Sequence, residues 1–464
     1  MIVKRFGLIL FSFVLVSCTT YYQVNQEFNS RFEQGNLESA EKYLKNNKTK
    51  RTKFLYYANR GVVNALEGNY EESNKWFERA YIYNEDYRKK VTDVAASLVV
   101  NATVIPYKAE DHEQLLLLYY KALNYLKMSN YESALVECRR LNDQLNQLSD
   151  RYKSDKKYKR DAFIHNLMGI AYEASGDINN AFIAYRNSYD IYKEDFTNLF
   201  GLSAPTQLKQ DILRSAYLNG FDNEVYFYEN EFGMKYKHET AEAELLFFWH
   251  NGLGPIKGEW SINFAVQDGG NGFMTFANSE YGMTYPFPIS SLSSEQSTSL
   301  KHLKVFRIAF PKYVERPPVF NSAYIETTAG RYDMELAEDI NQIAFKTLQE
   351  RMVKELSVGV LRVALKKAAE SAVREESEGW GAVLGLINAF TEKADTRNWQ
   401  TIPHSIYYSR IPLKVGENQI KLKTQNFKDG GSGTETFIFN VDQKGQTIFH
   451  SFQSLETKPF STAF

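Results

Sequence analysis

A pattern of small and aromatic residues recurs through the first half of this 464-residue chain and limits the folds open to it. In its clearest copy Gly68 precedes a segment that carries Phe77 and Ala80, and the segment before it carries Tyr57 and Gly61. Small residues let two paired helices approach closely, and aromatic residues fill the gap to the next pair. Each pair can bury its apolar face only against a neighbour, so the pattern predicts a solenoid of stacked helix pairs.

Four further copies follow the same spacing. Two are clear, at Ala122 to Leu141 and Gly169 to Ser188, and two are degenerate, at Gly35 to Leu44 and Leu208 to Phe232. The spacing resembles that of tetratricopeptide (TPR) repeats. Cys138 occupies a large-residue position in one copy, and we predict that it is a buried, free thiol.

In such a solenoid the first helix of each pair lines the concave groove. The corresponding positions are mostly apolar: Leu55, Ala58, Val62, Ala65, Leu116, Tyr119, Leu123, Leu126, Phe163 and Ile170. The candidate partner-binding residues are Leu55, Val62, Leu116, Tyr119, Leu123, Phe163 and Ile170. An apolar groove of this kind is expected to be filled. Its occupant is either a partner's segment or the chain's own amphipathic helix near Asp339 to Glu376, and we favour the latter because an open groove promotes aggregation.

From about His238 the pattern changes to short runs of aromatic and β-branched residues separated by Gly, Pro, Asn and Asp. These runs predict strands at Leu245 to Trp249, Trp260 to Val266, Lys304 to Phe310, Ser322 to Thr327, Gln419 to Thr424 and Glu435 to Val441. The glycine-rich stretches Asp268 to Gly272 and Asp429 to Gly433 lie between such runs and lack a following lysine-bearing helix. They therefore predict hairpin turns and not phosphate loops.

Within this region Asp339 to Glu376 has helical periodicity, and a second apolar segment, Trp380 to Phe390, follows. Charges recur too closely for a membrane-inserting element, so we predict a helical insertion at about 337–395. The fold class is α+β. The predicted domains are a signal peptide at 1–17, a TPR-like helical solenoid at 18–237 and a β-rich domain at 238–464 that contains the insertion.

The amino-terminal segment has the layout of a secretory signal. Lys4 and Arg5 precede a mostly apolar run from Phe6 to Val16, and the small Ser17 follows. A bilayer-spanning helix needs about 20 apolar residues, so this run is too short for a permanent anchor.

The stretch Leu15-Val16-Ser17-Cys18 resembles the lipobox of bacterial lipoproteins. The resemblance implies a diacylglycerol on the Cys18 sulfur, cleavage before Cys18 and acylation, for example by palmitate, of the new amino terminus. Each buried methylene contributes about 0.8 kcal/mol, so several acyl chains anchor a protein firmly. Thr19 replaces the aspartate of the inner-membrane retention signal, which favours the outer membrane, with the folded part on its periplasmic face. The alternative is an ordinary signal with an incidental cysteine.

Composition excludes some function classes. Removing Lys4 and Arg5 with the signal takes the formal net charge from −1 to about −3, which does not favour nucleic-acid binding. The seven histidines are scattered without metal-ligand spacing, and no G-x-S-x-G motif occurs. We therefore expect no cofactor, no metal site, no catalytic residues and no enzyme activity.

Several stretches carry a family resemblance. They are Ala102 to Leu141, then Asn251-Gly252-Leu253-Gly254-Pro255-Ile256-Lys257, then Ala394-Asp395-Thr396-Arg397-Asn398-Trp399, Ile402-Pro403 and Arg410. Together they resemble a group of poorly characterised bacterial lipoproteins with an N-terminal TPR region. We interpret the matching residues Asn251, Gly252, Pro255, Lys257, Asp395, Arg397, Trp399, Pro403 and Arg410 as structural, with a salt bridge between Asp395 and Arg397.

The resemblance implies a role in envelope assembly, because such proteins are encoded near envelope lipoproteins that include ones like the activators of penicillin-binding proteins. Three functions are consistent with the sequence. The first is a membrane-anchored scaffold that binds other envelope proteins through its repeats. The second is a regulator of peptidoglycan synthesis that contacts a penicillin-binding protein, and the third is a glycan-active enzyme. The partner's identity is not encoded in any motif.

Overall fold

The computed structural model describes residues 20–90, 105–151, 160–280, 283–350, 360, 363–365, 394–426, 428 and 430–460. The predicted signal peptide, Cys18, most of the stretch between the second and third repeats, most of the basic run 151–160, the apolar segment Trp380 to Phe390 and Asp429 lie outside the described residues.

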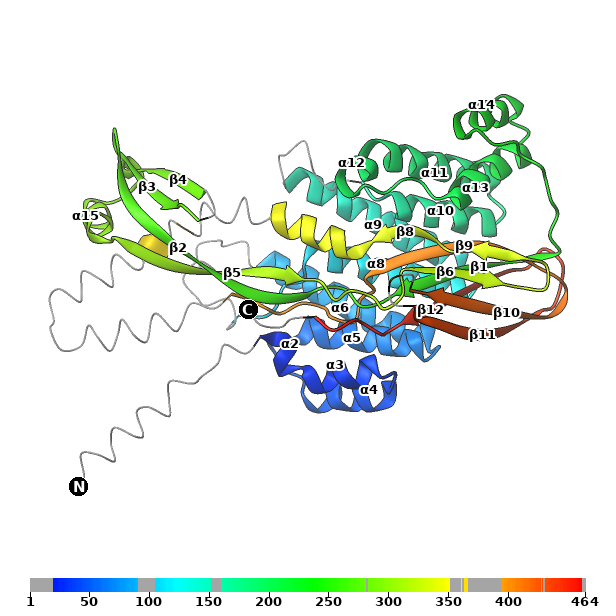
Figure 1. Cartoon of the computed structure of the whole chain (residues 1–464), viewed down its shortest axis with the longest axis horizontal. Helices are drawn as coiled ribbons and strands as arrows, with labels where there is room; N and C mark the ends of the chain where they lie inside the picture. The colour runs from blue at the N-terminus through cyan, green and yellow to red at the C-terminus, as the bar shows by residue number, and fades with distance from the viewer. Residues whose placement is uncertain are drawn as a thin grey trace, which may run out of the picture.

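The described chain from Tyr21 to Phe232 is helical (Figure 1). Its helices are α2 (Tyr21–Val24), α3 (Gln26–Glu33), α4 (Leu37–Asn46), α5 (Lys53–Leu66), α6 (Tyr70–Lys90), α8 (Asp111–Lys127), α9 (Tyr131–Arg151), α10 (Ala162–Ala174), α11 (Ile178–Ile191), the π-helix η1 (Tyr192–Phe196), α12 (Thr197–Phe200), α13 (Thr206–Leu218) and α14 (Asp222–Phe232).

These helices form the five pairs that the repeats predict: α3/α4, α5/α6, α8/α9, α10/α11 and α13/α14. The small residues act as expected. A Cβ atom on Gly61 would lie 2.3 Å from the Phe77 ring, and one on Gly169 would lie 2.3 Å from the Tyr185 ring. Cys138 is buried and free among the described residues, and burial raises the pKa of its thiol to about 12.

A β-rich region follows the helices. Its strands are β1 (Ala243–Asn251), β2 (Ile256–Gly270), β3 (Phe273–Asn278), β4 (Met283–Pro288), β5 (Val305–Val314), β6 (Ser322–Glu326), β7 (Arg331–Asp333), β8 (Glu335–Asp339), β9 (Ser405–Leu413), β10 (Gly416–Gln425), β11 (Ser432–Val441) and β12 (Thr447–Ser454). The 3-10 helix η2 (Ile289–Ser291) and α15 (Ser294–His302) lie between β4 and β5.

The strands form three four-stranded sheets. We name them the central sheet (β12-β1-β9-β8), the outer sheet (β11-β10-β6-β7) and the arm sheet (β4-β3-β2-β5). In the central sheet β1 pairs with β12 in parallel and with β9 in antiparallel.

The central sheet is the middle of three layers. Leu246 and Phe248 of β1 pack in one core with the helices, whereas Leu245, Phe247 and Trp249 pack against the outer sheet. A strand that is buried on both faces is apolar without alternation, which explains the run Leu-Leu-Phe-Phe-Trp in β1.

The arm sheet projects away from these layers (Figure 1). Its apolar face, which includes Ile262, Phe264 and Phe306, is packed with Leu300 of α15 and with Val363. The long strands β2 and β5 connect the arm to the body, since Ile256 pairs with Val314 at one end and Ala265 pairs with Val305 at the other.

The six predicted strands are confirmed within a few residues of their ends, and Asn271 and Gly272 form the predicted turn between β2 and β3. Strands β3, β4, β7, β8, β9 and β12 were not predicted. The predicted start of the helical insertion, at about 337, lies three residues before the helix, because 337–339 belong to β8, which pairs with β9. The helix begins at Ile340 and is described through 350.

Candidate functional site

The candidate site is the contact between the concave face of the helical array and the β-rich region. Trp399, from the loop between 394 and 404, is buried in this contact. Its ring centroid lies 6.4 Å from that of Phe54, 6.0 Å from that of Phe77 and 5.9 Å from that of Tyr120. Its indole N–H donates to Thr401 Oγ1 at 2.8 Å. A loop side chain thus fills the groove between α5, α6 and α8.

The central sheet covers the next part of the concave face. Tyr119 Oη lies within hydrogen-bond distance, 2.8 Å, of His250 Nε2 on β1. Further along, the ring of Phe163 lies 6.4 Å from Phe248 and 6.3 Å from Tyr408, centroid to centroid. Burial lowers the pKa of His250 to about 3, so the imidazole is neutral at physiological pH.

The groove is therefore filled in cis. The predicted partner-binding residues Leu55, Val62, Leu116, Tyr119, Leu123, Phe163 and Ile170 are all buried in the core that the helices share with the central sheet and Trp399. This corrects their assignment to a partner site. The predicted filler also differs: the helix that begins at Ile340 contributes Ile340 and Ile343, while the sheet and the Trp399 loop contribute most of the contact. A sheet presents a wider apolar face than one helix.

A buried group of charges joins α8 to the strands. Lys257 of β2 forms an ion pair with Glu110, and both side chains are buried. Next to it, Glu113 accepts hydrogen bonds from the Tyr107 hydroxyl at 2.7 Å and from the backbone N–H of Trp399 at 2.6 Å. Burial, together with the charge of Glu110, raises the pKa of Glu113 to about 7. Because an unpaired buried charge is costly, these contacts make the docked position of the Trp399 loop specific.

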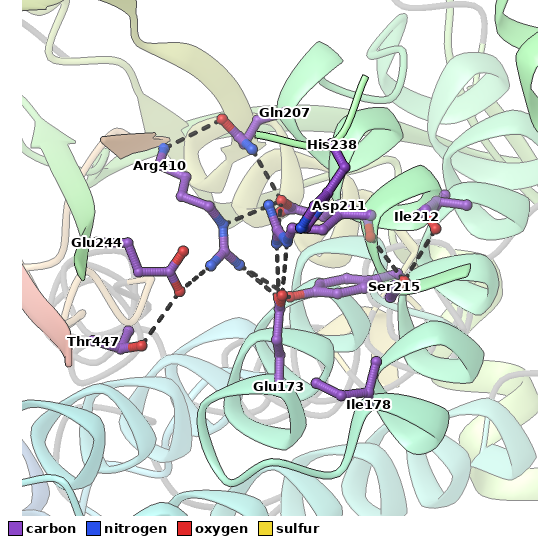
Figure 2. A network of polar contacts seen from close by, with 12 residues as sticks. Glu173, Ile178, Gln207, Asp211, Ile212, Ser215, His238, Glu244, Arg410 and Thr447 are labelled. Carbon is purple, nitrogen blue, oxygen red and sulfur yellow. Dashed lines mark hydrogen bonds and ion pairs between the residues drawn. The ribbon is translucent and has the colours of Figure 1, made fainter. Parts of the chain in front are cut away.

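A second group of charges surrounds Arg410 of β9 (Figure 2). Its guanidinium contacts Glu173 Oε2 at 2.8 Å and Asp211 Oδ1 at 3.2 Å, and it also pairs with Glu244 of β1. Arg214 of α13 pairs with the same Glu173 at 2.7 Å and with Asp211 at 2.8 Å. Burial opposes the charge of Glu173, but the two arginines outweigh it and lower its pKa to about 2.

The remaining resemblance residues support these contacts. Arg397 pairs with Asp395 at 2.7 Å and donates to the Ile105 carbonyl at 2.9 Å. Asn251 donates to the Phe320 carbonyl at 2.8 Å, and the Pro255 carbonyl accepts from Asn398 at 2.8 Å. The other two are Gly252, whose φ of 64° favours glycine, and Pro403, which is buried. Most of the nine residues thus lie where β2, β9 and the Trp399 loop meet the helices, whereas Asn251 and Gly252 lie beside Phe320 and Pro318.

A small cavity of about 10 Å³ lies in the same contact and is lined in part by His112, Asp161, Glu338 and Ile343. This volume is close to the minimum that holds one water molecule. Burial and the neighbouring Asp161 raise the pKa of Glu338 well above its usual range. No group of three His, Cys, Asp or Glu in the described part of the chain is arranged to hold a metal ion.

Sequence reasoning missed the acidic partners Glu110, Glu113, Glu173, Asp211 and Glu244, and also Arg316. Arg316 is buried and donates to the Gly254 carbonyl at 2.7 Å. One signal was available: Glu173 is the only Asp, Glu, Lys or Arg residue in the apolar helix α10. A single charge in such a helix indicates a buried partner.

Comparisons with known proteins give no family model and no curated protein that matches this chain. Solved structures do match. A MamA RS-1 double mutant has 14% identity and a TM-score of 0.29 over 45% of this chain and 89% of that one. The apo form of RapI has 15% identity and a TM-score of 0.33, and the match covers 46% of this chain and 68% of the RapI chain. TPR-like repeats of a putative kinesin light chain from Podospora anserina have 11% identity and a TM-score of 0.31 over 45% and 92%. At these scores, the repeat assignment rests on the helix pairs described above.

Proposed function

We propose that this protein is a lipid-anchored, non-catalytic scaffold that binds other proteins of the bacterial cell envelope. The observation that carries the proposal is the filled concave face. Because Trp399 and the central sheet occupy the groove, the helical array and the β-rich region form one body. Partners then have the outer surfaces of the second helices, the end of the array and the exposed strands as docking sites.

The position of Thr20 supports a short tether. Its side chain caps α2, and the backbone N–H of Tyr21 donates to Thr396 Oγ1 at 2.9 Å, which ties this segment to the Trp399 loop. Only Thr19 separates Cys18 from this buried residue. A lipidated Cys18 would therefore hold the folded body close to the membrane surface. No helix among the described residues is long and apolar enough to span a bilayer.

Regulation of peptidoglycan synthesis through a penicillin-binding protein is a narrower form of this proposal, and it rests on the family resemblance alone. The outer-membrane location rests on Thr19. Glycan cleavage is the rival function, and incubation of the purified mature protein with peptidoglycan tests it. We expect no soluble fragments, and their release would contradict the scaffold proposal.

Site-specific photo-crosslinking in cells tests the scaffold itself. Val136 of α9 and Ile183 of α11 occupy equivalent positions in successive repeats, and both side chains are exposed. A photoreactive residue at either position should give a discrete crosslinked species that mass spectrometry can identify. The matched control is Leu123, which is buried in the filled groove. Absence of crosslinks from all exposed positions would contradict the proposal.

A further inference from the structure

The last helix of the array, α14, presents two large aromatic side chains to solvent. Tyr226 is 66% exposed and Phe227 is 56% exposed. The opposite side of the helix is packed: Tyr228 is buried and its ring lies 6.2 Å from that of Phe182 on α11. The two exposed rings are therefore not part of the core of the array.

Acidic residues flank the two aromatic residues. Successive helical positions are rotated by about 100°, so Tyr226 and Phe227 lie on either side of the outer face of α14. The same rotation places Asp222 and Glu229 at one margin of this face and Glu224 and Glu231 at the other. These four carboxylates are the only charged residues of the helix. We call Tyr226, Phe227 and these four acidic residues the α14 face.

Two of the four carboxylates are paired. Glu229 forms an ion pair with Lys235 at 2.6 Å, and Glu231 forms one with Lys193 at 2.6 Å. No Lys, Arg or His of the described residues forms an ion pair with Asp222 or Glu224. The α14 face therefore carries two exposed aromatic rings, with Asn223 and Asn230 between them, and a net negative margin.

The position of α14 leaves most of this face uncovered by the described chain, and Lys235 Nζ lies 5.9 Å from the centroid of the Tyr226 ring. Gly233, with a φ of 63°, ends the helix, and the chain then runs to β1 without forming another helix pair. In Figure 1, α14 lies at the end of the array that is remote from the arm sheet. A terminal solenoid repeat normally has a polar outer face, and two exposed aromatic rings interrupt the polar face of α14.

We propose that the α14 face binds a basic amphipathic helix of another protein, as a continuation of the stacked helices. The inference rests on the proposed scaffold function and names the chemistry of one partner. An apolar stripe on such a helix would pack on Tyr226 and Phe227, and flanking Lys or Arg residues would face Asp222 and Glu224. A second copy of this chain fits less well, because a symmetric contact would bring the acidic margins of two α14 helices together.

Two synthetic peptides of about 18 residues, long enough for about five helical turns, test the proposal with the full mature chain. Both carry the same Leu stripe, flanked by Lys in one and by Glu in the other. Fluorescence anisotropy should show binding of the Lys peptide with an affinity at least about tenfold higher than that of the Glu peptide. Tyr226→Ser/Phe227→Ser should weaken Lys-peptide binding at least about tenfold. The matched control is Ile438→Ser, at a residue of the outer sheet that is 57% exposed.

Charge reversal gives an independent measurement. Asp222→Lys/Glu224→Lys alters exposed or half-buried positions and should shift the preference toward the Glu peptide. Equal binding of both peptides, or binding that the aromatic and charge variants leave unchanged, would overturn the proposal. So would a dimer in light scattering that the aromatic double variant dissociates, because the occupant would then be a second copy. Crosslinks from Val136 or Ile183 without peptide binding at α14 would leave the scaffold function standing and remove only this inference.

Discussion

Tyr119 and His250 are 131 residues apart in sequence, and their side chains lie 2.8 Å apart in the structure. The pair joins the first helix of the third repeat to the central strand β1. Both side chains are buried, and in the same contact Trp399 packs between the helices of neighbouring repeats. The concave face of this solenoid is thus part of the protein's own core, and the following predictions test that arrangement.

Trp399→Ala should destabilise the whole protein. The change removes an indole from a fully buried site, and truncations of this kind typically cost about 3–5 kcal/mol. Chemical unfolding of the purified chain measures the loss, and Trp399→Phe, which keeps part of the contact, should lose less. If Trp399→Ala had unchanged stability but lost its cellular role, the residue would belong to a functional surface and not to the core.

Gly61→Ala should destabilise the second repeat through one contact. The added Cβ would lie 2.3 Å from Phe77 Cε1, a distance that forces the ring to move, and overpacking of this kind costs about 1–3 kcal/mol. Phe77→Leu combined with Gly61→Ala should cost less than the sum of the two single changes, because the smaller side chain accommodates the methyl group. Additive losses would show that the ring contact is not the cause.

The contribution of Glu113 to the stability of the protein should fall as pH rises from about 4.5 to about 7. The folded-state pKa of Glu113 is raised from 4.5 to about 7, so the folded protein binds more protons than the unfolded chain in this window. At 1.36 kcal/mol per pKa unit the effect is about 3 kcal/mol. Urea unfolding across this range measures it as the difference between the wild-type protein and Glu113→Gln, because His250 and His450, whose pKa values burial lowers to about 3, act in the opposite direction below about 6.5.

Glu113→Gln mimics the protonated side chain, so the wild-type protein should lose stability relative to this variant as pH rises through the window. Glu173 acts outside this window, because its pKa is lowered and its contribution is lost only as pH falls from about 4.5 toward about 2. A slope that persists unchanged in Glu113→Gln would assign the effect to other groups, of which Glu338 has a shift in the same direction.

Arg410→Met should be strongly destabilising. The change removes the cation that Glu173, Asp211 and Glu244 share, and breaking a buried ion pair on one side typically costs about 3–5 kcal/mol. Arg160→Met is the matched control, since Arg160 pairs with Glu194 and Asp195 near the surface, where such pairs contribute about 0–1 kcal/mol. Similar melting temperatures for the two variants would contradict the role assigned to the Arg410 network.

Cys18→Ser should abolish lipid attachment. Serine cannot form the thioether, so the variant should remain unprocessed or be recovered in the soluble fraction. Metabolic labelling with a fatty acid and membrane fractionation provide the measurements. A variant that is still labelled and fractionates with the membrane would refute the anchoring proposal.

The repeats and half of the described strands were predictable because their signals are local. Gly61 and Phe77 belong to the two helices of one pair, and the β1 run is apolar because both of its faces are buried. The spacing of small and large residues within about 35 positions is sufficient to specify a helix pair, whatever lies elsewhere in the chain.

What fills the groove was decided only by tertiary structure. The sequence alone predicted an apolar concave face and favoured a filler from the same chain, but it assigned that role to the helix from Asp339 and did not consider the central sheet. Hydrophobic periodicity identifies the apolar face of a segment, but it does not identify the distant segment that packs against this face. The ion pairs Lys257–Glu110 and Arg410–Glu173 link residues 147 and 237 positions apart. Burial removes these charges from water, so each one requires an oppositely charged partner. The sequence shows which residues are charged, and only the folded structure shows which partner each of them meets.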